Sequence, residues 1–208
     1  MKKLGMFCLT LLLCVSLFGC SKPKPDPVVT SFCDAMQQYD FEAMKACMTA
    51  DWDESQDDLF SEEEEMEEES MLILKECAAK MTYEIESSEV TDDTANVTVS
   101  FTYQDLSPVL TNVMGEYIQQ AFAMAFTGAG ADEETMSTLF DTIFREQYDA
   151  AELTTITESM TFGCENTEEG WKIATIPEEF VDVATANMVQ ALEDLASDMN
   201  WAETEEAE

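Results

Sequence analysis

Residues 95–103 read ANVTVSFTY, which is the clearest strand pattern in the chain. Ala, Val, Val, Phe and Tyr occupy every second position, and Asn, Thr, Ser and Thr lie between them. Such strict alternation is typical of a β-strand with one buried and one exposed face. The sequence therefore predicts a half-buried strand here, and the rest of the domain must supply the core beneath it.

The flanking sequence extends this strand into a sheet of two hairpins. Residues 83–90 predict a weaker preceding strand, and Asp92-Asp93 supply a turn between the two. Further along, 154–165 and 170–173 also read as strands separated by a polar turn. We expect one antiparallel sheet.

Helical periodicity occupies the other segments, which gives an α+β class. Apolar residues recur there at three- and four-residue intervals. The predicted helices span residues 27–39, 41–48, 61–81, 108–125, 133–149 and 177–199. Asp40 is a predicted N-cap, and Ser61 with Glu64 fits a capping box. The long pair over 108–149 is expected to lie across the sheet.

The N-terminus is typical of a signal peptide. Two lysines precede an almost purely apolar run over 4–18, and Gly19 supplies a small residue at the cleavage point. The polar segment SKPKPDP at 21–27 follows at once. Cleavage is therefore expected rather than a membrane span.

Leu17-Phe18-Gly19-Cys20 resembles the lipobox of bacterial lipoproteins. The resemblance implies that Cys20 receives a diacylglyceryl thioether and becomes the mature N-terminus; a plain secreted protein is the alternative. Two acyl chains give stable anchoring where one gives only marginal binding. We therefore expect a lipid anchor on the extracytoplasmic face of the cell membrane. The expected organisation is a signal peptide at 1–19, a lipidated tether at 20–26, a single α+β domain at 27–200 and an acidic tail at 201–208.

The chain is strongly acidic, with 9 basic and 45 acidic residues and a formal net charge of −36. Such a surface repels phosphate backbones and anionic headgroups, which excludes nucleic acid as a partner. The acidic belt over 51–69 has oxygen ligands for weak Ca²⁺ binding, but it lacks the spaced Asp/Asn-Gly loop of a preorganised site. A solvated, charge-repelling surface is the alternative.

Seven cysteines are present, of which Cys8 and Cys14 lie in the signal peptide and Cys20 is the lipidation site. The mature thiols are then Cys33, Cys47, Cys77 and Cys164. Because Cys33 and Cys47 flank Asp40 at equal distance, an antiparallel helical hairpin can bring them together. Two alternatives follow: a disulfide that would stabilise the fold by roughly 3 kcal/mol, or a pair of buried free thiols.

The absence of histidine from the chain excludes whole classes of site. Ser-His-Asp catalysis, Cys-His catalysis and histidine-based zinc or iron centres all need an imidazole. Gly128-Ala129-Gly130 follows no strand, so it reads as a helix break rather than a phosphate-binding loop. The sequence thus indicates no cofactor and no metal.

The order of elements resembles the cystatin-like roll of the nuclear transport factor 2 superfamily, which includes exported lipoproteins of Gram-positive bacteria. The residues that carry the likeness are Asp40-Phe41-Glu42-Ala43-Met44 and Gly170-Trp171-Lys172-Ile173. The resemblance implies a sheet of two hairpins wrapped by N-terminal helices. Two departures, the long pair over 108–149 and the final helix after Pro177, suggest extra helices that cover or plug the cone.

Some enzymes of that superfamily use a carboxylate base and a tyrosine in an apolar cone. The resemblance offers Tyr83, Tyr103, Tyr117 and Glu158 as pocket residues, and their spacing does not select among them. Glu158 interrupts the apolar face of its strand. A buried carboxylate of raised pKa and an edge position facing water are both open.

The leading functional expectation is a non-enzymatic, surface-anchored binding or accessory module for a small apolar ligand or a protein. An isomerase- or dehydratase-like enzyme with a carboxylate base in the cone is the first alternative. An acidic envelope protein that binds cations with low affinity is the second. The fold resemblance alone supports the binding role.

Overall fold

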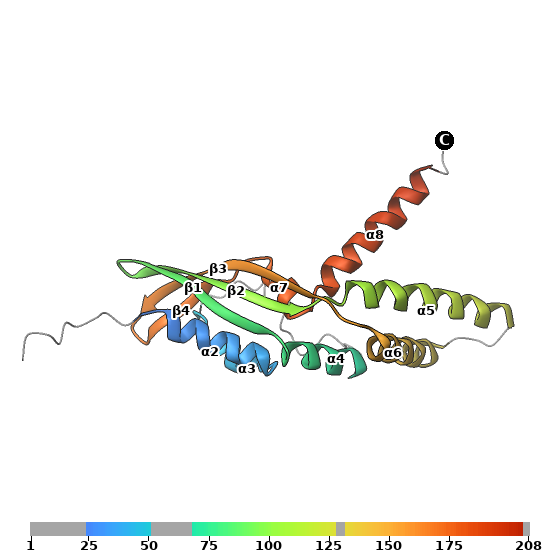
Figure 1. The fold of residues 1–208 in the computed structure, drawn as a ribbon, viewed down its shortest axis with the longest axis horizontal. Helices are drawn as coiled ribbons and strands as arrows, with labels where there is room; N and C mark the ends of the chain where they lie inside the picture. The colour runs from blue at the N-terminus through green and yellow to red at the C-terminus, as the bar shows by residue number, and fades with distance from the viewer. Residues whose placement is uncertain (1–23, 51–67, 128–131, 206–208) are drawn as a thin grey trace, which may run out of the picture.

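The computed structural model describes residues 24–50, 68–127 and 132–205. This part of the chain contains seven helices and one four-stranded antiparallel sheet of order β1-β2-β3-β4, so the predicted α+β class is confirmed (Figure 1). The strands are β1 (Thr82–Thr91), β2 (Thr94–Gln104), β3 (Thr155–Thr167) and β4 (Gly170–Thr175). The helices are α2 (Asp26–Gln37), α3 (Phe41–Ala46), α4 (Glu68–Ala78), α5 (Ser107–Thr127), α6 (Glu133–Ala150), α7 (Phe180–Ala184) and α8 (Met188–Glu205).

The predicted strand over 95–103 lies at the centre of the sheet as β2. Its residues alternate between buried and less buried positions along the whole length. Val97 faces Phe162 and Val99 faces Met160 on β3, so the apolar faces of the two strands coincide. The β1–β2 turn at Asp92-Asp93 is also confirmed, with Asp92 in the left-handed conformation at φ 54°.

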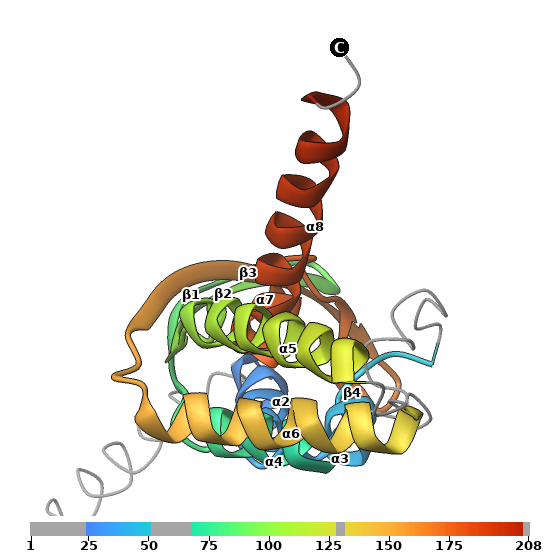
Figure 2. The same cartoon turned by 90° about the vertical axis from the view of Figure 1, so that its right-hand side faces the viewer.

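Four phenylalanines fill the inner side of the curved sheet, which arches over α2 and α7 (Figure 2). Their side chains are fully buried, and their ring centroids lie 5.3–6.1 Å apart in tilted and edge-to-face pairs. Such pairs add roughly 0.5–1.5 kcal/mol each beyond the burial of their area. We call this set, Phe32 of α2, Phe101 of β2, Phe162 of β3 and Phe180 of α7, the phenylalanine cluster.

The predicted N-terminal helical hairpin is confirmed. The Asp40 carboxylate caps α3 by accepting a hydrogen bond from the Ala43 N–H at 3.0 Å. Tyr39 ends α2 with a positive φ of 56°, and the Asp40 N–H donates to the Ala35 carbonyl. Helix α2 begins at Asp26, within the segment that the sequence predicted as tether, and the Asp26 side chain does not cap it.

The predicted position of the long helical pair is wrong. Helices α5 and α6 do not lie across the sheet. They pack against each other and extend the molecule beyond one end of the sheet (Figures 1 and 2). A second hydrophobic cluster holds them, built from α4, α5 and α6 around the fully buried Phe144. The resemblance implied that these helices cover or plug a cone, but the pair packs on α4 and on a core of its own instead.

The single C-terminal helix predicted from residue 177 is two helices. Ala186 and Asn187 adopt positive φ angles of 49° and 66°, which separates α7 from α8. The Asn187 N–H donates to the Asp182 carbonyl at 2.7 Å, a Schellman-type end to α7 with alanine where glycine is usual. Helix α8 then projects away from the body and continues past residue 201 to Glu205 (Figure 1).

Asp105 links the junction between α7 and α8 to the start of α5 through hydrogen bonds. Its carboxylate accepts hydrogen bonds from the Ser107 N–H at 3.0 Å, the Ser107 hydroxyl at 2.5 Å and the Asn187 amide at 3.1 Å. Burial raises the pKa of Asp105, but these hydrogen bonds outweigh it and hold the pKa below its usual value. The charged form is therefore the one that the fold stabilises.

A pH dependence follows from this junction. Because the folded pKa lies below the unfolded one, the Asp105 contribution is complete above about pH 4 and is lost as the pH falls through the folded value. We expect Asp105→Asn to reduce the free energy of unfolding by on the order of 1 kcal/mol at neutral pH. In urea titrations from pH 7 to pH 2.5, the difference between wild type and variant should shrink below pH 4. A difference that does not change with pH would contradict this role.

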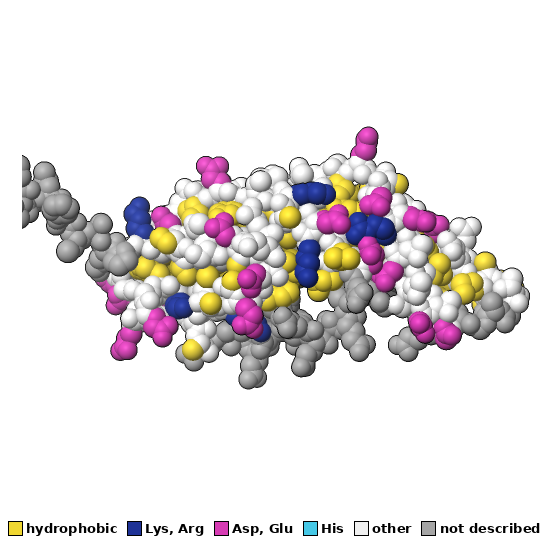
Figure 3. All heavy atoms as spheres, turned by 90° about the horizontal axis from the view of Figure 1, so that it is seen from below, with side chains coloured by type: hydrophobic (Ala, Val, Ile, Leu, Met, Phe, Trp, Pro, Cys, Tyr) yellow, Lys and Arg dark blue, Asp and Glu magenta, His cyan; other side chains and the backbone are white. Residues whose placement is uncertain are grey.

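On the face seen in Figure 3, acidic side chains are scattered along the whole length, and lysine and arginine side chains lie among them. None of the helices in the described part of the chain combines the length and the hydrophobicity that crossing a bilayer requires.

Candidate functional site

A cavity of about 450 Å³ opens beside the free edge of β3. Strand β4 pairs with β3 only from Gly163 onward, so the preceding residues of β3 have no strand on that side. The segment that leads into α7 lies there instead. The cavity is lined by Glu158, Ser159, Met160, Thr161, Pro177, Glu179 and Asp182.

Glu158, one of the predicted pocket residues, lines this cavity and contacts a second one, Tyr103, which is not part of the lining. The Tyr103 hydroxyl donates a hydrogen bond to Oε2 of Glu158 at 3.2 Å. Burial, and then the neighbouring Glu158 carboxylate, raise the pKa of Tyr103, so the phenol stays protonated as the donor. Glu158 shares the inward-facing register of Phe162, but it is exposed to solvent. The edge position facing water is therefore the alternative that the structure shows.

Glu179 and Asp182 add two further carboxylates to the cavity wall. Burial raises the pKa of Asp182 first, and repulsion from Glu158, Glu193 and Glu179 raises it further. Carboxylates that repel one another favour a proton or a cation among them. The chemistry of this cavity is accordingly that of a weakly acidic, water-exposed recess.

The other two predicted pocket residues lie elsewhere. Tyr83 on β1 donates a hydrogen bond to the Asp34 carboxylate of α2 at 2.6 Å, which ties the edge strand to the helix. Tyr117 on α5 packs edge-to-face on Phe140 of α6 with centroids 5.7 Å apart. The four candidate residues therefore do not line one pocket, and only Tyr103 and Glu158 are in contact with each other.

All four cysteines within the described residues are buried free thiols, so the structure has no bond between Cys33 and Cys47. Cys47 follows the last residue of the short α3, and its thiol donates back to the Ala43 carbonyl at 3.4 Å. Burial raises the pKa of Cys33, Cys47, Cys77 and Cys164, that of Cys164 to about 12. Protonated, buried thiols behave as small hydrophobic groups rather than nucleophiles.

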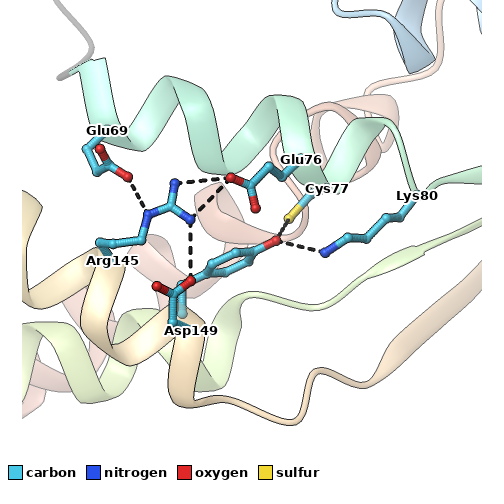
Figure 4. Close-up of polar contacts among 7 residues, drawn as sticks. Glu69, Glu76, Cys77, Lys80, Arg145 and Asp149 are labelled. Atoms are coloured by element: carbon cyan, nitrogen blue, oxygen red, sulfur yellow. Dashed lines mark hydrogen bonds and ion pairs between the residues drawn. The ribbon is translucent and has the colours of Figure 1, made fainter.

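Arg145 on α6 is the centre of a polar network with α4 (Figure 4). Its guanidinium binds Glu69 and Asp149, and two of its nitrogens bind Glu76 at 3.2 Å. Beside it, the Lys80 ammonium donates to the Tyr148 hydroxyl at 3.0 Å, and both cations lie 5.4 Å from the Tyr148 ring centroid. Every member has a partner within the protein, so this network joins two helices rather than forming an open site.

We expect Arg145→Met to lower the free energy of unfolding by about 1–2 kcal/mol, because three carboxylates would then face one another without the guanidinium. Arg145→Lys should restore only part of the loss, since an ammonium cannot make the forked contact. Urea denaturation of the three proteins measures this. Equal stability of the methionine and wild-type proteins would show that the network contributes nothing.

The outer half of α5 carries large apolar side chains that are exposed rather than packed in the core. Ile118, Phe122 and Phe126 are 42%, 64% and 89% exposed. They follow one another at four-residue spacing, so they lie along one side of the helix. We call these three residues the α5 face. The signal available in the sequence was the composition of α5, which has Glu116 as its only charged residue and apolar residues on every side.

Several predicted features lie outside the described residues: the signal peptide, Cys20, the Ser61–Glu64 capping box and most of the acidic belt over 51–69. Within the parts of the chain that the structure covers, no three His, Cys, Asp or Glu side chains are grouped so that they could hold a metal ion.

Comparison of the chain with protein-family models, with curated proteins and with solved structures finds no match in any of the three.

Proposed function

We propose that this protein is a lipid-anchored, extracytoplasmic binding module that engages a protein partner through its surface and catalyses no reaction of its own. Cys20 carries the anchor, and the domain after the tether carries the binding surface. The observation that carries the binding role is the exposure of Phe122 and Phe126 on an almost uncharged helix.

The location is supported by the N-terminal sequence. A cationic start, an apolar run and Gly19-Cys20 together meet the requirements of an exported, lipid-modified chain. The polar segment after Cys20 leads within a few residues to α2. A thioether-linked diacylglycerol on Cys20 would hold the domain close to the membrane without a spanning helix.

Binding at the surface is supported by the way the inner side of the sheet is filled. The phenylalanine cluster occupies the space in which a roll of this kind would hold a small apolar ligand. Glu158 lies beside a tyrosine hydroxyl, as the enzyme alternative requires, but it faces water rather than an apolar cone. A carboxylate base of that kind works in a site from which water is excluded, and this exposed position does not exclude water.

The shape of the molecule also suits an anchored module. Helix α2 begins at one end, and the outer half of α5 lies at the other (Figure 1). A lipid a few residues before α2 would leave the α5 face at the end away from the anchor. Large exposed apolar patches on folded domains mark interaction sites more often than not.

The finer fold assignment is a variant of the cystatin-like roll. It is supported by the antiparallel order β1-β2-β3-β4 and by the arch of the sheet over the N-terminal helix α2 (Figure 2). Helices α5, α6 and α8 would then be additions at one end of the roll.

The test of the proposed function is the behaviour of the native protein in cells. We expect it in the detergent phase after Triton X-114 partition of membranes, retained there in high salt, because two acyl chains rather than charge hold it. Protease added to intact cells or protoplasts should digest it. Recovery in the aqueous phase, or full protection from protease, would reject the proposal.

A further inference from the structure

The α5 face is a ridge of the kind that helices use to pack against one another. Its three side chains repeat every four residues and span about 12 Å along the axis. Rows of this spacing interdigitate with a matching row on a second helix, the commonest form of helix packing in globular proteins. The same row is buried nearer the start of α5, at Leu110, and becomes exposed further out.

The charge around this ridge has one sign. Residues 81–144 contain no lysine or arginine, and neither does α8. Helix α5 carries one acidic residue, and α6 and α8 carry five each. The only basic residue in the sequences of these three helices is Arg145. Asp132 and Glu134 are exposed at the start of α6, five or more residues beyond the end of α5, so they lie at the same end of the helical pair as Phe126.

We propose that the α5 face binds a cationic amphipathic helix of another protein, with the apolar row of that helix on Ile118, Phe122 and Phe126 and its lysines and arginines toward the acidic start of α6. This rests on the proposed function and names the class of partner for it. An apolar ridge within a field of carboxylates is complementary to an apolar row flanked by basic residues.

The same charge argues against two other occupants. A second copy of the chain would bring another net charge of −36 against the first, which opposes association through this end. An anionic membrane surface is repelled for the same reason, although its apolar interior would accept the phenylalanines. A basic helix satisfies both the apolar ridge and the surrounding carboxylates.

The test uses the mature chain from residue 20 with Cys20→Ser, so that no lipid competes for the peptide. The probe is a fluorescently labelled synthetic helix of about 18 residues, with leucines on one face and lysines on the other. Its counterparts are a peptide with glutamate in place of each lysine and a scrambled leucine–lysine peptide without an apolar face. Fluorescence anisotropy at several salt concentrations gives the three affinities.

We expect the amphipathic basic peptide to bind at least about tenfold more tightly than either counterpart, and its affinity to fall as salt rises. The double variant Phe122→Ser/Phe126→Ser should weaken binding by on the order of tenfold or more. Leu72→Ser on α4 is the matched control, because Leu72 is also half exposed (50%) and the change alters no charge. It should change the affinity by less than about twofold.

Three results would overturn the inference. Equal binding of the scrambled peptide would reduce the interaction to unspecific charge attraction. Unchanged binding by the Phe122→Ser/Phe126→Ser variant would place the peptide elsewhere. A dimer of the protein alone, abolished by the same two substitutions in sedimentation experiments, would make a second copy the occupant. None of these affects the Triton X-114 result, so failure of the partner class and failure of the anchored module are distinguishable.

Discussion

Phe162→Ala should lower the free energy of unfolding by about 3–5 kcal/mol, the largest loss that we expect from any single substitution in the domain. Phe162 is fully buried at the centre of the phenylalanine cluster and contacts Phe32, Phe101 and Phe180 at centroid distances of 5.7, 6.1 and 5.7 Å. The substitution removes an aromatic ring from the contact between sheet, α2 and α7. The surrounding side chains come from three different elements, so they cannot collapse into the cavity without moving the backbone.

Urea denaturation followed by tryptophan fluorescence measures this loss, since Trp171 lies in the same core. Phe126→Ala is the matched control, because it makes the same chemical change at a side chain that is 89% exposed. That variant should lie within about 0.5 kcal/mol of wild type. Similar losses at the two positions would mean that the sheet does not close over the cluster as described.

Cys20→Ala should abolish incorporation of fatty acid into the protein, an all-or-none effect. The thioether needs a thiol at this position, and the methyl group of alanine offers no nucleophile. Each buried methylene contributes roughly 0.8 kcal/mol to membrane binding, so losing two acyl chains removes far more free energy than any surface substitution could restore. Metabolic labelling with a fatty-acid analogue, followed by capture of the protein, measures the effect.

Cys47→Ala is the control for this experiment. Cys47 is a buried free thiol within the domain, so the variant should keep the full label. A labelled Cys20→Ala protein would place the lipid on another residue. An unlabelled wild-type protein would show that the chain carries no lipid anchor.

The sheet could be predicted from the sequence because one face of β2 is buried and the other is not. The alternation over 95–103 reflects this directly, and the register with β3 brings Val97 to Phe162 as the two apolar faces require. Asp40 was also predictable as a helix cap, since its carboxylate accepts a hydrogen bond from the backbone N–H three residues further on.

The helical additions could not be placed in the same way. Periodicity shows that α5 has an apolar side, but it does not show what covers that side, and the outer half remains exposed. The break between α7 and α8 carries no glycine or proline; Ala186 and Asn187 take the left-handed conformation while the apolar period continues across them. Tertiary contacts, including the Asn187 amide on Asp105, decide the geometry there.

The candidate site was predictable only in part. Tyr103 and Glu158 were candidates from the resemblance, and the β2–β3 register is what brings the hydroxyl to the carboxylate. Tyr83 and Tyr117 have the same residue type but lie on β1 and α5, where each serves a local contact. Residue type alone could not separate these four, because their grouping depends on the fold.

The mass of the native protein extracted from membranes is the sharpest test of the lipid anchor at Cys20. We expect a chain that begins at Cys20, lacks residues 1–19 and carries the added mass of a diacylglyceryl group on its N-terminal peptide. A free thiol at Cys20, or a chain that still begins at Met1, would contradict the anchored location and the function proposed from it.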